Sequence, residues 1–202
     1  MVKNSEKEKA DRLQQICLLA DRYAFPQVRV KARTVLLKAG QKASRVYFVK
    51  QGGLRLWMDH NGREITNQFF FEGGIVASLE SMFTNQPSDF YLETIEDSTL
   101  YVLEKKKFGQ LWQKDPEFKD WFHTHMISRF IYYSRHLLSF LRDKPESRYS
   151  KLLINNPEVI LRVPQHYIAS YLGITPVSLS RIRSKLLREE KNKQSPEQGT
   201  GS

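Results

Sequence analysis

The segment covering residues 163–186 constrains the fold more than any other part of the chain. Ile168 and Leu172 have the spacing of the inner face of a short helix, and Gly173 follows them directly. A glycine at this place is typical of a helix end, because the backbone there often adopts the left-handed conformation. Thr175 then begins a second helix, since threonine is a good N-cap residue. This order of helix, tight turn and helix is typical of a helix-turn-helix.

The second helix has one apolar face and one basic face. Pro176 suits its first position, where a missing N–H costs nothing, and Leu179, Ile182 and Leu186 recur on the inner face. The opposite face suits the major groove of DNA, where arginine binds guanine with two hydrogen bonds and serine or lysine binds phosphate. An ordinary helical hairpin with a solvated basic face is the alternative. With the N-cap included, the residues that we expect to contact DNA are Thr175, Val177, Ser178, Arg181, Ser184, Lys185 and Arg188.

The chain is strongly basic, with a net charge of +10, which indicates an anionic partner: nucleic acid first and a membrane surface second. The 59 residues from Lys144 onward carry half of that excess. No apolar stretch resembles a secretory signal or approaches the roughly 20 residues of a membrane span. We therefore expect a cytoplasmic protein that does not enter a membrane. The single cysteine, Cys17, excludes an internal disulfide and an all-cysteine metal site within one chain.

Residues 28–103 have the pattern of several short strands separated by turns, which predicts a β-sandwich or jelly-roll-like barrel. The clearest turn is Asn61-Gly62, because a two-residue type I′ hairpin needs positive φ at both central positions. The register that this turn predicts pairs Met58 with Ile65, Asp59 with Glu64, and Leu54 with Phe69.

Residues 115–142 are predicted to form one long helix that begins at Asp115-Pro116. Its apolar stripe contains Phe118, Phe122, Met126, Phe130, Tyr133, Leu137 and Leu141. A second apolar set widens this stripe beyond what one sandwich can cover, namely Trp121, Ile127, Ile131 and Leu138. Either the whole surface packs inside the chain, or the helix pairs with its twin in a homodimer, with Phe130 and Leu137 central.

The predicted architecture is therefore α+β, in three parts. Residues 1–142 form a jelly-roll-like β-roll effector domain that includes the long dimerisation helix. Residues 143–188 form the helix-turn-helix domain, and Asp143 is expected to cap its first helix with Glu146 as the reciprocal partner. Residues 189–202 are polar without an apolar anchor, which predicts a disordered tail.

A strand domain, one long helix and a basic helix-turn-helix together resemble the Crp/Fnr, or catabolite-activator, family of bacterial transcription regulators. The resemblance rests on VYFVKQGGLRLW in the strand region and on SRYSKLL and VPQHYIASYLGITPVSLSRIRSKL near the end. It implies a homodimer that binds a palindromic operator in double-stranded DNA under the control of an effector in the β-roll. RNA polymerase is a further partner of this class.

The chain departs from the cyclic-nucleotide binders of that family, which carry a Gly-Glu pair and, about ten residues later, Arg-Ser or Arg-Thr. Ala77-Ser78 and Ser88-Asp89 stand at these places, and no lysine or arginine lies between Arg63 and Lys105. Because a phosphate pocket without a cation is unfavourable, we expect an unknown small-molecule effector other than cyclic AMP. The effector pocket that the resemblance implies contains Gly73, Gly74, Ser78, Ser88, Asp89, Tyr133 and Ser134.

Two further departures concern DNA. The wing that follows the recognition helix in the family has no counterpart in the pattern, because the chain becomes polar after Leu187. The family's Arg and Glu base readers correspond to Pro176 and Val177, and only Arg181 is kept, so the target sequence should differ. The second functional hypothesis is accordingly a ligand-binding or interaction module whose DNA-binding helices are vestigial.

Enzymatic chemistry is not indicated. His123-Thr124-His125 resembles a metal-binding pair, but residues i and i+2 of a helix point apart. No phosphate-binding glycine loop occurs. We expect a protein without enzyme activity, resident cofactor or metal.

Overall fold

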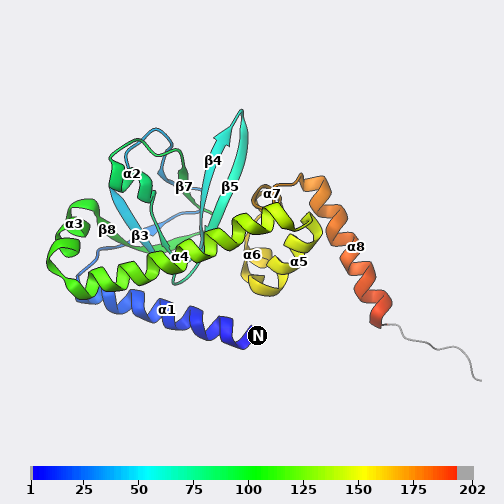
Figure 1. Ribbon diagram of the computed structural model, residues 1–202, viewed down its shortest axis with the longest axis horizontal. Helices are drawn as coiled ribbons and strands as arrows, with labels where there is room; N and C mark the ends of the chain where they lie inside the picture. Colours follow the sequence, from blue (N-terminus) through cyan, green and yellow to red (C-terminus); the bar gives the residue numbers. More distant parts are fainter. Residues whose placement is uncertain (1, 195–202) are drawn as a thin grey trace, which may run out of the picture. The chain divides into compact units, whose positions relative to one another are not determined.

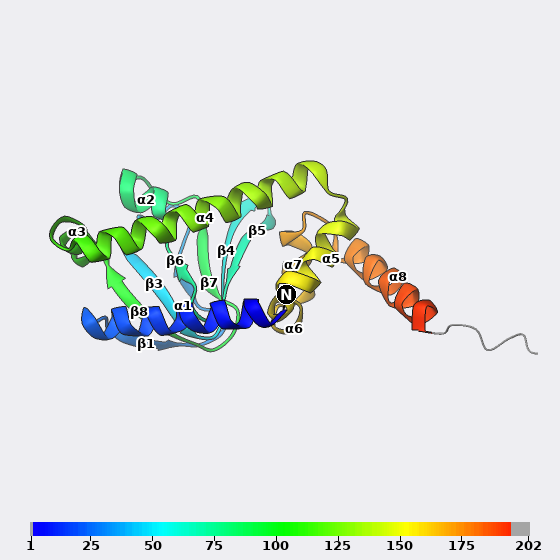
Figure 2. The same cartoon turned by 60° about the horizontal axis from the view of Figure 1, so that its bottom comes forward.

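The computed structural model describes the backbone of residues 2–194 and the side chains of residues 7–189. The chain forms two compact units that divide between Arg142 and Asp143. Unit 1 combines two β-sheets with helices, whereas the described elements of unit 2 are all helices (Figures 1 and 2). The α+β class predicted from the sequence is confirmed.

The described strands of unit 1 form two antiparallel sheets. The first sheet has the order β1 (Gln27–Val30), β8 (Ser98–Glu104), β3 (Arg45–Gln51) and β6 (Ile75–Val76). The second has the order β2 (Val35–Leu37), β7 (Tyr91–Thr94), β4 (Leu54–His60) and β5 (Arg63–Phe70). Apolar side chains from both sheets are buried in one core, among them Val46, Phe48, Leu54, Leu92 and Leu100.

The β4–β5 hairpin turns at Asn61 and Gly62, whose φ angles are 55° and 76°. Both values are positive, as the predicted type I′ turn requires. Near the turn the predicted register is confirmed: Met58 pairs with Ile65, and Asp59 with Glu64. Further along it is wrong by one residue, since Leu54 pairs with Phe70 and not with Phe69. A β-bulge between Leu56 and Trp57 causes the shift, because it adds one residue, Asn67, to β5.

Four helices complete the described part of unit 1: α1 (Val2–Arg22), α2 (Leu79–Thr84), α3 (Lys105–Lys114) and α4 (Pro116–Arg142). Both α1 and α4 run along the β-roll (Figures 1 and 2). Ile16 and Ala20 of α1 are buried in the common core. A Cβ atom on Gly73, where φ is +78°, would lie 3.1 Å from Arg12 Cβ, so the close approach of α1 requires glycine there.

Unit 2 contains α5 (Pro145–Asn155), α6 (Pro157–Arg162), α7 (Gln165–Tyr171) and α8 (Pro176–Gln194). The prediction that Asp143 caps α5 is wrong. Lys144 occupies the N-cap position, because a residue before proline is held in an extended conformation. The Asp143 carboxylate instead lies 2.6 Å from Lys151 Nζ.

Helix α8 continues to Gln194, six residues beyond the predicted end of the domain at residue 188. The prediction of a disordered tail is therefore wrong for residues 189–194, where glutamate, lysine and glutamine favour helix. Residues 195–202 of that tail lie outside the described chain. A wing beyond Gln194 would fall in residues that lie outside the described chain, so its expected absence stays a prediction. None of the helices, over the residues described, is long and apolar enough to cross a membrane.

Candidate DNA-binding surface and effector cavity

The turn between α7 and α8 has the geometry that the sequence predicts. Gly173 has φ of +67°. Its N–H donates to the carbonyl of Ser170, and the N–H of Ile174 donates to the carbonyl of Ala169, both at 3.0 Å. These two bonds form a Schellman motif, which satisfies carbonyl groups at the end of α7. The turn is therefore stabilised by local hydrogen bonds.

Thr175 caps the beginning of α8, as predicted. Its Oγ1 accepts a hydrogen bond from the N–H of Ser178 at 3.1 Å and lies 2.9 Å from Ser178 Oγ. Pro176 is the first residue of the helix. The hydroxyl groups of Thr175 and Ser178, both expected to contact DNA, thus also hold the first turn of α8 in place.

The inner face of α8 packs within unit 2. Leu179 and Ile182 are buried together with Ile168 and Ala169 of α7. Arg148 of α5, which the sequence did not single out, donates from its Nη2 to the carbonyl of Leu172 at 2.8 Å. This bond joins α5 to the last turn of α7. No sequence pattern indicates it, because the two residues lie 24 positions apart.

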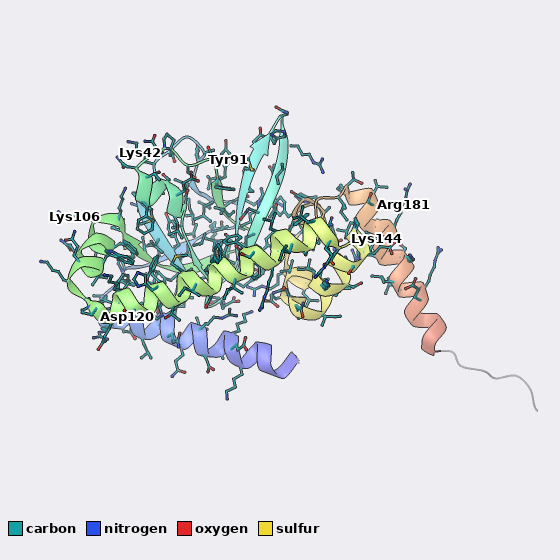
Figure 3. All side chains as sticks on the ribbon, viewed as in Figure 1. Lys42, Tyr91, Lys106, Asp120, Lys144 and Arg181 are labelled. Carbon is teal, nitrogen blue, oxygen red and sulfur yellow. The ribbon has the colours of Figure 1, made fainter. Side chains whose placement is uncertain are left out.

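The outer face of α8 carries the remaining expected contact residues. Val177, Arg181, Ser184 and Arg188 are exposed, and Arg181 is labelled on α8 in Figure 3. Lys185 is also exposed, but its Nζ lies 3.0 Å from Glu146 Oε2 on α5. The structure therefore brings the predicted residues together on one solvent-facing surface, the α8 surface, with one of its cations paired.

Part of the apolar stripe on α4 is buried in unit 1, and part is exposed. Phe118 and Phe122 lie in the core. Beyond them Phe130 is 72% exposed and Leu137 is 61% exposed. With Ile127, Ser134 and Leu141 they follow alternating steps of three and four residues, which is the heptad spacing of a coiled coil. We call these five residues the α4 seam.

A cavity of about 250 Å³ lies within unit 1, between the β-roll and α4. Its apolar lining comes mainly from Val46, Leu56, Phe70, Ile75, Val76, Leu79, Phe90, Phe122 and Met126. Its polar lining consists of Asn67, Ser78, Glu80, His125, Arg129 and Tyr133. Asn67 is the residue that the β-bulge adds to β5, so the bulge contributes a polar group to the wall.

Arg129 is the cation of this cavity. Its Nη2 donates to Gln68 Oε1 at 2.7 Å and to Tyr133 Oη at 2.9 Å. Its guanidinium carbon lies 4.8 Å from the ring centre of Phe70 and 4.9 Å from that of Tyr133. This cation lies outside the segment between Arg63 and Lys105, where the family resemblance places the phosphate-binding arginine. The helical spacing of Arg129, four residues from both His125 and Tyr133, was a signal that could have found it.

The histidine in the cavity is uncharged at neutral pH. Burial lowers the pKa of His125 to about 4, and the positive charges of Arg129 and Arg12 act in the same direction. His125 stacks on Trp121, whereas His123 contacts Trp112, so the two histidines point apart as expected. No cluster of three or more metal-binding side chains occurs among the residues that the structure describes.

The cavity includes two of the residues expected in the effector pocket, Ser78 and Tyr133. Ser88 is buried behind it, where its Oγ donates to Ser78 Oγ at 2.9 Å. The other four expected residues do not line the cavity, and they are Gly73, Gly74, Asp89 and Ser134. Gly73 and Gly74 bond with Val49 in the strand region, and Asp89 is exposed.

Comparison with known proteins identifies a cyclic nucleotide-binding domain in unit 1 and a similar transcription regulator. Residues 27–115 match the family model of the cyclic nucleotide-binding domain. The transcriptional regulatory protein Btr of Bordetella pertussis is 24% identical over 182 residues, which cover 84% of this chain and 74% of Btr.

Solved structures show the same fold. FixK2 from Bradyrhizobium japonicum matches with a TM-score of 0.73 and 17% identity, over 82% of this chain and 86% of FixK2. A CRP/FNR-family transcriptional regulator from Thermus thermophilus matches with a TM-score of 0.67 and 21% identity, over 81% and 87% of the two chains. The chain thus contains a cyclic nucleotide-binding domain and is similar, in sequence and in fold, to transcription regulators of the Crp/Fnr family.

Proposed function

We propose that this protein is a sequence-specific DNA-binding regulator that binds a palindromic operator as a homodimer. The α8 surface carries the proposal, because it combines a capped helix start with exposed Arg181 and Arg188. Arg181 lies one turn beyond Val177, where an arginine reaches a guanine edge and a valine contacts a thymine methyl group. The similarity of the chain to Crp/Fnr regulators and its basic charge agree with this role.

The α4 seam supports the dimeric part of the proposal. Large apolar side chains that are exposed at heptad spacing favour association with an equivalent helix. In a twofold dimer, two copies of α8 would contact half-sites about 34 Å apart, one turn of DNA. The operator is then a palindrome with that spacing.

An effector in the cavity of unit 1 completes the proposal. The cavity is bounded by α4, the same helix that carries the seam, so a ligand there contacts the proposed dimer helix directly through Arg129 and Tyr133. The effector is not cyclic AMP, since Ser78 of the wall accepts a hydrogen bond from Ser88 behind it and no cation lies between Arg63 and Lys105.

Selection of duplexes from a random library by the full-length protein tests the proposal. We expect enriched sequences to contain two inverted half-sites about 10 base pairs apart, centre to centre. The matched control is Arg29→Ala, which removes an exposed arginine from unit 1 and should leave the enriched sequence unchanged. The absence of any enriched sequence, with weak and uniform binding to all duplexes, would support the alternative, a ligand-binding or interaction module with vestigial DNA-binding helices.

A further inference from the structure

The charge of the cavity in unit 1 is determined by few groups. Arg129 is its lining cation, His125 is neutral at pH 7, and Tyr133 has its pKa raised by burial. Glu80, the acidic residue of the lining, is exposed on α2. The interior is therefore positive at Arg129 and apolar over most of the remaining wall.

Arg129 keeps part of its hydrogen-bonding capacity for another partner. A guanidinium has five N–H donors. Its Nη2 serves Gln68 and Tyr133, whereas Nε and Nη1 form no hydrogen bond with any residue that the structure describes. No carboxylate of a described residue forms an ion pair with it either. A partly buried cation without a counter-ion is costly, so an anion that enters the cavity is stabilised by it.

The geometry around Arg129 is also rigid. Phe70 and Tyr133 place their rings against the guanidinium, and Gln68 fixes its Nη2 edge. A group held in this way loses little conformational freedom when it binds a ligand. The site is thus prepared for one anionic group at a defined position.

The rest of the cavity suits an apolar body of small size. Phe70, Phe90, Phe122 and Met126 supply aromatic and thioether surface. The volume of about 250 Å³ lies just below the roughly 300–1,000 Å³ of pockets for larger ligands. One guanidinium balances one negative charge, which favours a carboxylate over a dianionic phosphate.

We propose that this cavity binds a small aromatic carboxylic acid, with Arg129 as the group that binds the carboxylate and the apolar wall as the site of the ring. The inference deepens the proposed function, since it names the chemical class of the effector and rests on that function for the ligand's regulatory role. In contrast to the cyclic-nucleotide binders of the family, the anion-binding residue comes from α4 and not from the strand region.

Calorimetric titration with phenylacetate and with phenylacetamide tests this inference, because the two probes have nearly the same shape and differ in charge. With the unmodified full-length protein we expect phenylacetate to bind at least about tenfold more tightly, as a charge-assisted hydrogen bond exceeds a neutral one. Arg129→Gln should abolish this preference, and Arg129→Lys should keep part of it. Arg29→Gln, which removes an exposed arginine of the same unit, should leave it intact.

The NMR signals of the His125 ring provide a second readout that does not depend on any variant. They should shift with phenylacetate, because His125 and Arg129 line the same cavity. Equal affinity for the two probes, no binding of either at millimolar concentration, or binding without a His125 shift would overturn the inference. DNA is absent from both measurements, so a failure here is distinct from a failure to select an operator.

Discussion

Lys185 Nζ lies 3.0 Å from Glu146 Oε2, so a cation of the α8 surface is paired with a carboxylate of α5. The hydrogen bond from Lys185 to Glu146 raises the pKa of Lys185, which therefore stays charged at neutral pH. Both side chains are about half exposed, and such exposed pairs contribute little to stability. The pair therefore has a larger consequence for DNA binding than for folding, because Glu146 places a negative charge beside the expected phosphate contact.

Glu146→Gln should accordingly strengthen binding to random DNA. We expect a gain of about two- to fivefold at low salt, with a steeper salt dependence, because Lys185 is then free to pair with phosphate. Fluorescence anisotropy with a random duplex at two salt concentrations measures both effects. Glu104→Gln is the control, since it frees Arg45 in unit 1 from a similar ion pair. An equal gain from both variants would show that only the net charge matters.

Arg181 and Arg188 should differ in what they contact. Arg181→Ala should cost about 1–3 kcal/mol on the operator and relax the preference at one base position. Arg188 lies two turns further along α8, so Arg188→Ala should weaken operator and random DNA alike and reduce the salt slope by about one. Titrations of both variants with operator and scrambled duplexes distinguish these results. Equal losses on the two duplexes for Arg181→Ala would identify it as a phosphate contact.

The α4 seam should determine the oligomeric state. Phe130→Glu or Leu137→Glu places a charge among exposed apolar residues, so we expect a monomer at micromolar concentration and a change in folding stability within about 1 kcal/mol. Analytical ultracentrifugation measures the mass. Thr124→Glu adds the same charge to α4 outside the seam and should leave the dimer intact. A monomeric unmodified protein would contradict the dimer.

His125 should make folding stability depend on pH. Its pKa is about 4 in the folded protein and about 6.5 in the unfolded chain, so only the unfolded chain binds a proton between these values. The contribution of neutral His125 to the free energy of unfolding is fully present above pH 6.5 and is lost as the pH falls towards 4. The loss amounts to about 2.5 kcal/mol at pH 4.5.

Urea unfolding at pH 7.5 and pH 4.5 measures this loss. We expect His125→Gln to lose about 2.5 kcal/mol less than the unmodified protein between the two pH values. His60→Gln, at an exposed hairpin position, should behave like the unmodified protein. If His125→Gln shows the same loss, carboxylates rather than His125 account for the acid sensitivity.

Cyclic AMP should not bind appreciably. The segment between Ile75 and Phe90 has no cation to hold the cyclic phosphate, and the lining cation of the cavity, Arg129, lies on α4 instead. The missing charge-assisted bonds amount to about 1.5–3 kcal/mol each. Calorimetric titration checks this expectation, and a micromolar dissociation constant for cyclic AMP would contradict it.

Local chemistry made several features predictable from the sequence. The left-handed Gly173, the cap at Thr175 and the turn at Asn61-Gly62 each depend on residues within a few positions of one another. The same holds for the apolar and basic faces of α8, because helical spacing alone determines which side chains share a face. The helix-turn-helix and its outer residues could therefore be identified without coordinates.

Tertiary structure decided what distant residues do together. Arg129 donates to Gln68 across 61 positions, Arg148 donates to Leu172 across 24, and Lys185 pairs with Glu146 across 39. The one-residue bulge in β5 likewise shifted the strand register and brought Asn67 to the cavity. Each depends on how separate elements pack, and neither propensity nor periodicity carries that information. The sequence by itself thus determined the elements and the surface of α8, whereas packing alone decided which side chains form the cavity.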